Sequence, residues 1–209
     1  MFFSFDGIDG VGKSTQVRLF CDALRERDED FVLCRDPGST PLGERIRELL
    51  LTSDATTPIG VRSEMLLYMA ARAQLVEEVI GPALAANRIV VADRFLLANV
   101  VYQGYAGGLN VGDLWQVGRI ATAGVYPDCV FLLDMSPESA DQRMNRPLDR
   151  IENQGCEYRR RLREGFLAEA AVAERQVRVV DADRSVDEIQ TEVWRLASSL
   201  LEARSRPSQ

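Results

Sequence analysis

The residues best suited to chemistry lie near the start of the chain, in the stretch FFSFDGIDGVGKST. Gly7, Gly12, Lys13 and Ser14 match the pattern G-x-x-x-x-G-K-[ST], in which backbone N–H groups and a lysine hold phosphate oxygens. An apolar run precedes the loop and a helical pattern follows it, which is the context that such a loop requires. The sequence therefore predicts a site for a nucleoside triphosphate, formed by Gly7, Ile8, Asp9, Gly10, Val11, Gly12, Lys13, Ser14 and Thr15.

The side chains of this loop are expected to have different roles in binding a triphosphate. We expect Lys13 to reach the β and γ phosphates and the Ser14 hydroxyl to ligate Mg²⁺. Asp9 needs a separate explanation, because a carboxylate next to bound phosphates is repelled by about 1 kcal/mol or more even in water. Either Asp9 contacts a second ligand at the rim of the loop, or it is only a solvated side chain.

A second motif, RIVVADR, is an apolar run that ends in Asp93 and Arg94. In phosphate-loop proteins an acid at the end of such a strand holds Mg²⁺ directly or through water. Arg94 would place a cation at the carboxyl edge of the sheet, where open α/β sheets bind their ligands. We therefore expect Asp93 and Ser14 to be the metal residues, with Asp9 nearby.

Composition excludes several other kinds of site. The chain of 209 residues has no histidine, which rules out Ser-His-Asp and Cys-His catalysis. The four cysteines, Cys21, Cys34, Cys129 and Cys156, are widely spaced, so we expect free thiols and no zinc site. A net charge of −7 argues against nucleic acid as a partner. No apolar run is long enough to span a membrane and no signal peptide is recognisable, which predicts a cytoplasmic protein.

Short apolar runs that alternate with helical patterns must position these motifs. We expect strands at Phe2–Phe5, Phe31–Cys34, Ile89–Ala92, Cys129–Leu133 and Val177–Val180. We expect helices at Ser14–Arg27, Gly43–Leu51, Val61–Ala85, Val111–Ala123, Pro137–Met144, Tyr158–Arg175 and Val186–Ala203. The alternation predicts an α/β fold in a single domain spanning residues 1–209, with a parallel sheet covered by helices on both faces.

The polar stretch NRPLDRIENQGCE falls between two of these helices and contains Pro147 and Gly155. Its composition and the arginines around it predict a mobile flap, although an inert surface loop has the same composition. We place this lid segment at about residues 143–157.

Five blocks together resemble the thymidylate kinases, a family of nucleoside monophosphate kinases. In chain order they are FDGIDGVGKST, CRDPGSTPLGERIRELLL, LLYMAARAQLVEEVIGPAL, DRFLLANVVYQG and LDRIE. The resemblance implies a P-loop nucleoside monophosphate kinase fold with a five-stranded parallel sheet, and a homodimer packed through helices. It also implies Mg²⁺ as cofactor and the reaction ATP + dTMP → ADP + dTDP.

The resemblance also implies which residues bind dTMP. Tyr68 stands where the family stacks a ring on thymine, and Arg72, four residues later on the same helix face, stands where it hydrogen-bonds the base. Alternatively, Tyr68 belongs to the core and Arg72 is a solvated helix end. The complete set of predicted dTMP residues is Asp9, Pro37, Tyr68, Arg72, Arg94, Asn99, Tyr102 and Gln103.

The resemblance to the family also implies a role for the other residues of this set. Arg94 matches the arginine that holds the acceptor phosphate, and Asn99 and Gln103 match positions near the base. Tyr102 matches the ring that crowds the 2′ position of the sugar. Asp9 matches an acid that accepts a hydrogen bond from the 3′-hydroxyl of dTMP.

The chain departs from the family pattern at three positions. Ala98 replaces a frequent serine, and Asp36 replaces a frequent glutamate in the loop Asp36–Gly38 that covers the acceptor. Val11 stands where some members carry an arginine inside the phosphate loop, so the catalytic cations must come from the lid, as in the bacterial type. Lys13, Arg94, Arg143, Arg146 and Arg150 are therefore the predicted catalytic residues, and part of Arg159, Arg160, Arg161 and Arg163 is expected to be a solvated helix face.

Two other functions remain as alternatives. A deoxynucleoside kinase shares the fold but needs a carboxylate base, for which Asp36 or Asp6 could serve. A phosphate-loop binding module without catalysis would keep the fold alone. A GTPase is disfavoured, because the sequence contains no N-K-x-D tetrapeptide for reading guanine.

Overall fold

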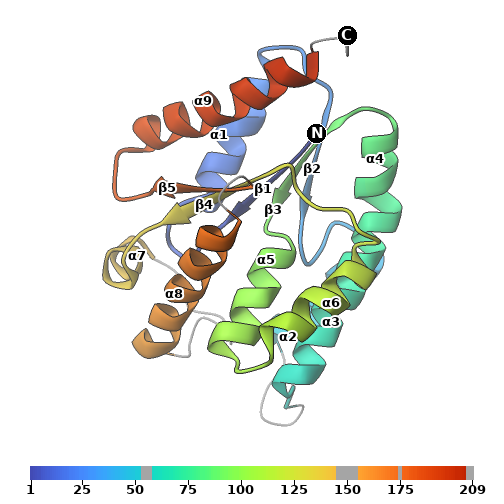
Figure 1. Ribbon diagram of the computed structural model, residues 1–209, viewed down its shortest axis with the longest axis vertical. Helices are drawn as coiled ribbons and strands as arrows, with labels where there is room; N and C mark the ends of the chain where they lie inside the picture. The colour runs from blue at the N-terminus through green and yellow to red at the C-terminus, as the bar shows by residue number, and fades with distance from the viewer. Residues whose placement is uncertain (53–57, 145–154, 174–175, 206–209) are drawn as a thin grey trace.

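Five parallel strands form one sheet in the order β2-β3-β1-β4-β5 in the computed structural model (Figure 1). The structure describes residues 1–52, 58–144, 155–173 and 176–205. The strands are β1 (Phe2–Asp6), β2 (Phe31–Arg35), β3 (Ile89–Asp93), β4 (Cys129–Asp134) and β5 (Val177–Asp181). Each predicted strand is present, and each extends one residue further, to a charged side chain at the carboxyl edge.

The helices cover both faces of this sheet. Helices α1 (Lys13–Arg25) and α9 (Val186–Ser205) pack against each other on one face, whereas α5 (Leu96–Asn99) and α8 (Cys156–Val172) lie on the other (Figure 1). Helix α3 (Val61–Leu75) packs against both α2 (Pro41–Thr52) and α6 (Val111–Ala121). The remaining helices are α4 (Gly81–Ala85) and α7 (Pro137–Arg143).

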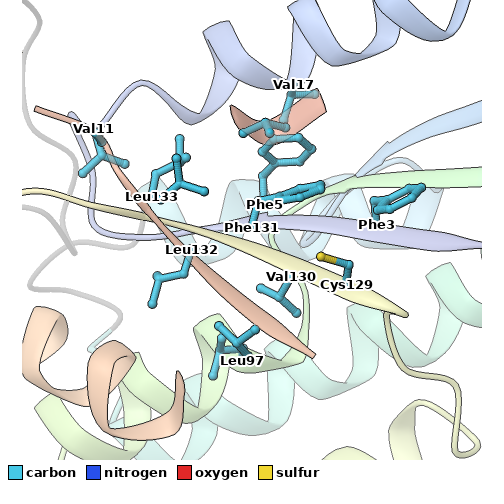
Figure 2. Close-up of a cluster of buried hydrophobic side chains, with 14 of the residues drawn as sticks. Phe3, Phe5, Val11, Val17, Leu97, Cys129, Val130, Phe131, Leu132 and Leu133 are labelled. Carbon is cyan, nitrogen blue, oxygen red and sulfur yellow. The ribbon is translucent and has the colours of Figure 1, made fainter. Parts of the chain in front are cut away.

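Strand alternation produces a core on each side of the sheet. Phe3 and Phe5 of β1 pack on Phe20 of α1, and the preceding Phe2 packs edge-on against Phe95 on the opposite face. Figure 2 shows the same division in β4, where Phe131 lies on the side of Val17 and its neighbours Val130 and Leu132 lie on the side of Leu97. Because both faces are covered, the strands are apolar at almost every position.

Two helical segments differ from the sequence prediction. The predicted helix Val61–Ala85 is interrupted by a π-helical segment, η1 (Val76–Ile80), which ends two residues before Pro82. Proline has no N–H and its ring crowds the carbonyl four residues earlier, so a widened turn accommodates it. The segment formed by α5 and a second π-helix, η2 (Val100–Ala106), was not predicted as a helix, because it is buried almost throughout and lacks an amphipathic pattern.

Two further expectations can be compared with the structure. All four cysteines are free thiols, as predicted. Within the described ranges, every helix is too short or too polar to cross a lipid bilayer.

Candidate active site

The phosphate loop connects β1 to α1 and depends on its glycines. A Cβ at Gly7, where φ is 130°, would lie 2.4 Å from the carbonyl oxygen of Leu133 on β4. A Cβ at Gly10 would lie 2.4 Å from the carbonyl oxygen of Ala140 on α7. The loop is therefore seated between two backbone segments that leave no space for side chains, and Lys13 begins the helix that follows it.

Lys13 and Arg94 converge on this loop. Lys13 Nζ donates to the carbonyl oxygens of Gly7 at 3.1 Å and Ile8 at 2.7 Å, and it lies 3.5 Å from Asp9 Oδ1. Arg94 Nη1 donates to the Gly7 carbonyl oxygen at 2.9 Å, and Nη2 forms an ion pair with Asp9. Both cations thus bind groups of the loop itself.

Backbone conformation and a tyrosine complete this cluster. Arg94 has a φ of 68°, a left-handed conformation that turns the chain away from β3. The Tyr102 hydroxyl donates to Asp9 Oδ2 at 2.8 Å and accepts from Arg94 Nη2 at 3.0 Å. Asp9, which looked out of place in a phosphate-binding loop, therefore lies within hydrogen-bonding distance of Lys13, Arg94 and Tyr102.

The cluster changes the protonation of its members. Burial by itself would raise the pKa of Asp9, but Arg94, Lys13 and the Tyr102 hydroxyl outweigh it and hold the pKa well below its usual range. Burial, followed by the charge of Arg94, lowers the pKa of Lys13 to about 8. Asp9 is therefore ionised at neutral pH, and Lys13 is closer to losing its proton than a solvated lysine.

A second polar cluster lies around Arg72, which is 1% exposed. Arg72 Nε donates to Asp36 Oδ2 at 2.6 Å, and Nη1 donates to Asn99 Oδ1 at 2.9 Å. Asn99 Nδ2 in turn donates to Gln103 Oε1 at 2.5 Å. The alternative that Arg72 is a solvated helix end is therefore wrong, because the side chain is buried and paired.

One cavity of about 540 Å³ joins the two clusters. Its lining includes Gly10, Gly12, Lys13, Ser14 and Thr15 at the phosphate loop, and it extends to Tyr68, Arg72, Asn99, Tyr102 and Gln103. Asp9, Pro37, Asp93, Arg94 and Arg143 line it as well. Gly7, Ile8 and Val11 do not line it, since the side chains of Ile8 and Val11 are 3% and 1% exposed and belong to the core.

The carboxyl ends of β1 and β3 supply oxygen groups near the loop. Asp93 and the exposed Ser14 line the cavity, and both oxygens of the fully buried Asp6 lack a hydrogen-bond partner. Burial raises the pKa of Asp6 to about 7. In the described ranges no three His, Cys, Asp or Glu side chains form a ready metal site, so a cation here would need water or phosphate ligands as well. Hard oxygen groups of this kind suit Mg²⁺, which usually keeps waters and substrate phosphates as ligands.

The arginines around the predicted lid have separate positions. Arg143, at the end of α7, lines the cavity and donates from Nη1 to the Ala182 carbonyl oxygen at 3.0 Å. Arg146 and Arg150, and most of the lid segment, lie outside the described residues. On α8, Arg160 is exposed as expected, whereas Arg159 is buried against Asp141, so only part of that helix face is solvated.

The sequence did not single out two cations of the cavity wall. Arg35 ends β2 and pairs with Glu44, and Arg47 on α2 donates to the Pro37 carbonyl oxygen at 3.2 Å. Arg35 could have been found as the charged residue that follows an apolar strand, the signal that identified Asp93. Arg47 belongs to no such motif, and only the fold brings it to the cavity.

Comparisons with known proteins agree with this arrangement. The family model for thymidylate kinase matches residues 5–193. The chain belongs to the thymidylate kinase family. It is 44% identical over 207 residues to the thymidylate kinase of Symbiobacterium thermophilum, covering 99% of this chain and 96% of the relative. It is 43% identical over 202 residues to that of Fervidobacterium nodosum, covering 96% and 100% of the two chains.

A solved thymidylate kinase structure has the same fold. The thymidylate kinase from Ehrlichia chaffeensis superimposes with a TM-score of 0.79 at 29% identity, covering 94% of this chain and 98% of the other. The predicted family membership and the P-loop nucleoside monophosphate kinase fold are thereby confirmed, as is the assignment to phosphoryl-transferring enzymes. The alternative of a phosphate-loop binding module without catalysis does not agree with this family membership.

Proposed function

We propose that this chain transfers the γ-phosphoryl group of ATP to dTMP, giving ADP and dTDP. The observation that carries the proposal is the single cavity that joins a phosphate loop to a buried wall of Arg72, Asn99 and Gln103. A triphosphate and a nucleoside monophosphate can both reach this space, with the acceptor phosphate directed towards the loop. The family membership supports the same substrates.

The reaction needs positioning and charge neutralisation more than proton transfer. An oxygen of the dTMP phosphate attacks the γ-phosphorus, a new P–O bond forms, and the bond to the β–γ bridging oxygen breaks as ADP leaves. The attacking oxygen is already anionic near neutral pH, so no general base is required. In our proposal Lys13 neutralises the β and γ phosphates and Arg94 holds the acceptor phosphate.

We assign the remaining catalytic charge to the lid side of the cavity. Arg143 lines the cavity close to the phosphate loop, and Arg146 and Arg150 follow it in the chain. Arginines that clamp a transferring phosphoryl group can raise the rate by about 10³-fold or more. Val11 gives the phosphate loop no such cation of its own, which supports this assignment.

Mg²⁺ fits the oxygen groups near the loop. Ser14 and Asp93 would hold it, Asp93 directly or through water, with Asp9 close by. When bound, the ion would neutralise the phosphates of ATP. The protein itself holds Asp93 at the carboxyl end of β3 and Ser14 near the start of α1, and both residues line the cavity.

The opposite end of the cavity is our proposed site for the base and sugar. Tyr68 offers a flat face for stacking, Arg72 and Asn99 offer a donor and an acceptor, and Gln103 lies beside Asn99. Pro37 and Tyr102 border the same space, and Ala98 lines it without offering a hydroxyl. Asp9 would accept from the 3′-hydroxyl of the sugar.

We also propose a homodimer that forms through α2, α3 and α6. These neighbouring helices expose Leu42 and Leu49 on α2, Leu66 on α3 and Ile120 on α6, with Ile120 78% exposed. Apolar side chains gathered on adjacent helices favour burial against another copy. Light scattering coupled to gel filtration would test the proposal, since a monomer at micromolar concentration would contradict it. The expected cytoplasmic location stays a prediction.

A substrate comparison tests the proposed reaction. We expect ATP-dependent ADP release with dTMP and little or none with thymidine, UMP, CMP, AMP or GMP. Turnover of thymidine but not dTMP would favour a deoxynucleoside kinase instead. The structure gives that alternative little support, because Asp36, one of its two possible bases, is ion-paired with Arg72 and the other, Asp6, does not line the cavity.

A further inference from the structure

The hydrogen bonds behind the base end of the cavity continue beyond Gln103. Gln103 Nε2 donates to Glu64 Oε1 at 2.8 Å, and this follows the bonds from Asn99 to Gln103 and from Arg72 to Asn99. Glu64 lies on α3 and is 8% exposed, but it does not line the cavity. It is the one member of this chain of hydrogen bonds that a bound base would not touch.

The two end residues of this series of hydrogen bonds, Arg72 and Glu64, determine how the side-chain amides of Asn99 and Gln103 are oriented. Arginine can only donate, so Asn99 must turn its oxygen towards Arg72 and its nitrogen towards Gln103. Gln103 must then present its oxygen to Asn99 and its nitrogen to the next group. The Oε1 oxygen of Glu64, which accepts from Gln103, completes this order. Glu64 and Arg72 together therefore exclude the flipped orientation of either amide.

This orientation decides what the cavity offers to a base. The Asn99 oxygen keeps a second lone pair, and it lies beside the donating guanidinium of Arg72. Thymine carries a matching donor at N3 next to an acceptor at O4. Cytosine carries an acceptor at N3 next to a donor amino group, so each of its groups would meet a group of its own kind. The orientation of these side chains therefore also determines which base the cavity favours.

We infer that Glu64 is a positioning residue for the acceptor base. By holding Gln103, and through it Asn99, Glu64 sets the wall to accept the thymine edge and to reject the cytosine edge. The inference rests on the proposed function, because it assigns this wall to the base of the acceptor. Helix spacing supports it, since Glu64, Tyr68 and Arg72 follow at intervals of four and share one face of α3.

The test compares Glu64→Met and Glu64→Gln with the wild type, using kcat/KM for dTMP, dUMP and dCMP at saturating ATP. Methionine has a similar length but no strong acceptor, so the Gln103 amide loses its anchor. We expect kcat/KM for dTMP to fall about tenfold or more, because a buried donor is left unsatisfied. The loss should appear in KM for dTMP and not in KM for ATP. The dTMP-to-dCMP ratio should fall as well, whereas the dTMP-to-dUMP ratio should not change, because those two bases present the same edge.

Two variants separate positioning from general stability. Glu64→Gln should stay close to wild type, because its amide oxygen can still accept from Gln103. Glu169→Met is the matched control: Glu169 accepts from Tyr105 and Trp115 at 2.8 Å and 3.1 Å and does not line the cavity. It should lower the melting temperature without changing the dTMP-to-dCMP ratio.

A double substitution tests the route through Gln103. If Glu64 acts through this amide, Glu64→Met/Gln103→Met should have the same dTMP-to-dCMP ratio as Gln103→Met alone. Additive losses, or an unchanged ratio in Glu64→Met, would overturn the inference. Should Glu64→Met not fold, Gln103→Met breaks the same hydrogen bond from the other side, and an unchanged ratio there would also overturn it. A wild-type protein that does not phosphorylate dTMP would instead contradict the proposed function.

Discussion

At the phosphate end of the cavity, Lys13 and Arg94 are held by groups that a bound phosphate could replace. At the base end, Arg72 is held by groups that can remain its partners when a base binds. Lys13 binds two loop carbonyl oxygens, and Arg94 binds Asp9. Arg72 binds Asp36 and Asn99 in a fully buried setting. The Asp9 and Arg94 side chains of the first cluster are partly exposed, whereas the side chains of the second cluster are buried in the cavity wall.

This difference matches what each end has to recognise. Phosphate oxygens are strong acceptors that can take over the hydrogen bonds of a lysine or an arginine, so temporary partners cost little to replace. A base is neutral and is distinguished by the arrangement of donors and acceptors, so its site benefits from groups whose orientation is fixed beforehand. The phosphate end should therefore be sensitive to charge and pH, and the base end to the loss of any single partner.

Removing Lys13 should have the largest effect on turnover. We expect Lys13→Ala to lower kcat by about 10²–10³-fold, the loss typical for one transition-state donor. The melting temperature should change little, because the amino group binds loop carbonyls and not the core. Steady-state kinetics and thermal unfolding measure both quantities. A nearly normal kcat would remove the phosphate loop from the mechanism.

Removing Arg72 should damage the base end in two ways. Arg72→Ala leaves Asp36 buried without its cation, which costs about 3–5 kcal/mol of folding free energy. It should also raise KM for dTMP far more than KM for ATP. Arg88→Ala is a suitable control, since Arg88 pairs with the exposed Asp30. Equal losses for both substrates would contradict the assignment of Arg72 to the base.

Replacing Asp9 should weaken recognition of the sugar, which lies between the phosphate end and the base end of the cavity in our proposal. With Asp9→Ala, the preference for dTMP over an analogue without the 3′-hydroxyl should fall by up to about tenfold, since a hydrogen bond to a charged group is lost. The ratio of the two kcat/KM values measures this preference. An unchanged ratio would leave Asp9 only as the partner of Arg94, Lys13 and Tyr102.

Raising the pH should weaken the phosphate end before the base end. In the free protein Lys13 has a pKa of about 8, so it loses its proton, and its attraction for phosphate, as the pH rises through that value. We expect kcat/KM for ATP to fall above pH 8, approaching tenfold per pH unit. The base end of the cavity does not depend on Lys13, so dTMP binding should fall less. A profile that is flat to pH 10 would contradict the lowered pKa.

Replacing Asp6 should have the smallest effect, and it should appear as stability. The folded-state pKa of Asp6 is raised to about 7, so its protonated form favours folding at low pH and this contribution is lost as the pH rises towards 7. Asp6→Asn should therefore raise the melting temperature at pH 8 by several degrees, since 1 kcal/mol corresponds to roughly 2–4 °C in a chain of this size. At pH 4 the difference should nearly disappear. A destabilised variant at pH 8 would indicate that the carboxylate has a partner after all.

Sequence patterns predicted the sheet well, because buried parallel strands are continuous apolar runs. All five strands were predicted, and each prediction stopped one residue before the observed last residue of the strand, which is Asp6, Arg35, Asp93, Asp134 or Asp181. The rule that strands are apolar excluded the charged residues that terminate them. These terminal residues include some of the groups that form the site, such as Asp93.

The sequence predicted less well where burial hides periodicity. Residues 96–106, which form α5 and η2, are helical and buried almost throughout, so they have no polar face to mark the helical period. Nearly all predicted site residues that the structure describes line the cavity, because motifs preserve local spacing. Arg47 and Glu64 were missed because only the packing of α2 and α3 brings them to that region.

The π-helical segment η2 places two neighbouring residues in the two different polar clusters that line the cavity. Tyr102 binds Asp9 and Arg94, and the next residue, Gln103, binds Asn99 and Glu64. One peptide bond is therefore the shortest mechanical link between the phosphate end and the base end. Because Tyr102 and Gln103 are consecutive residues of η2, the backbone ties the geometry of the phosphate cluster to that of the base cluster.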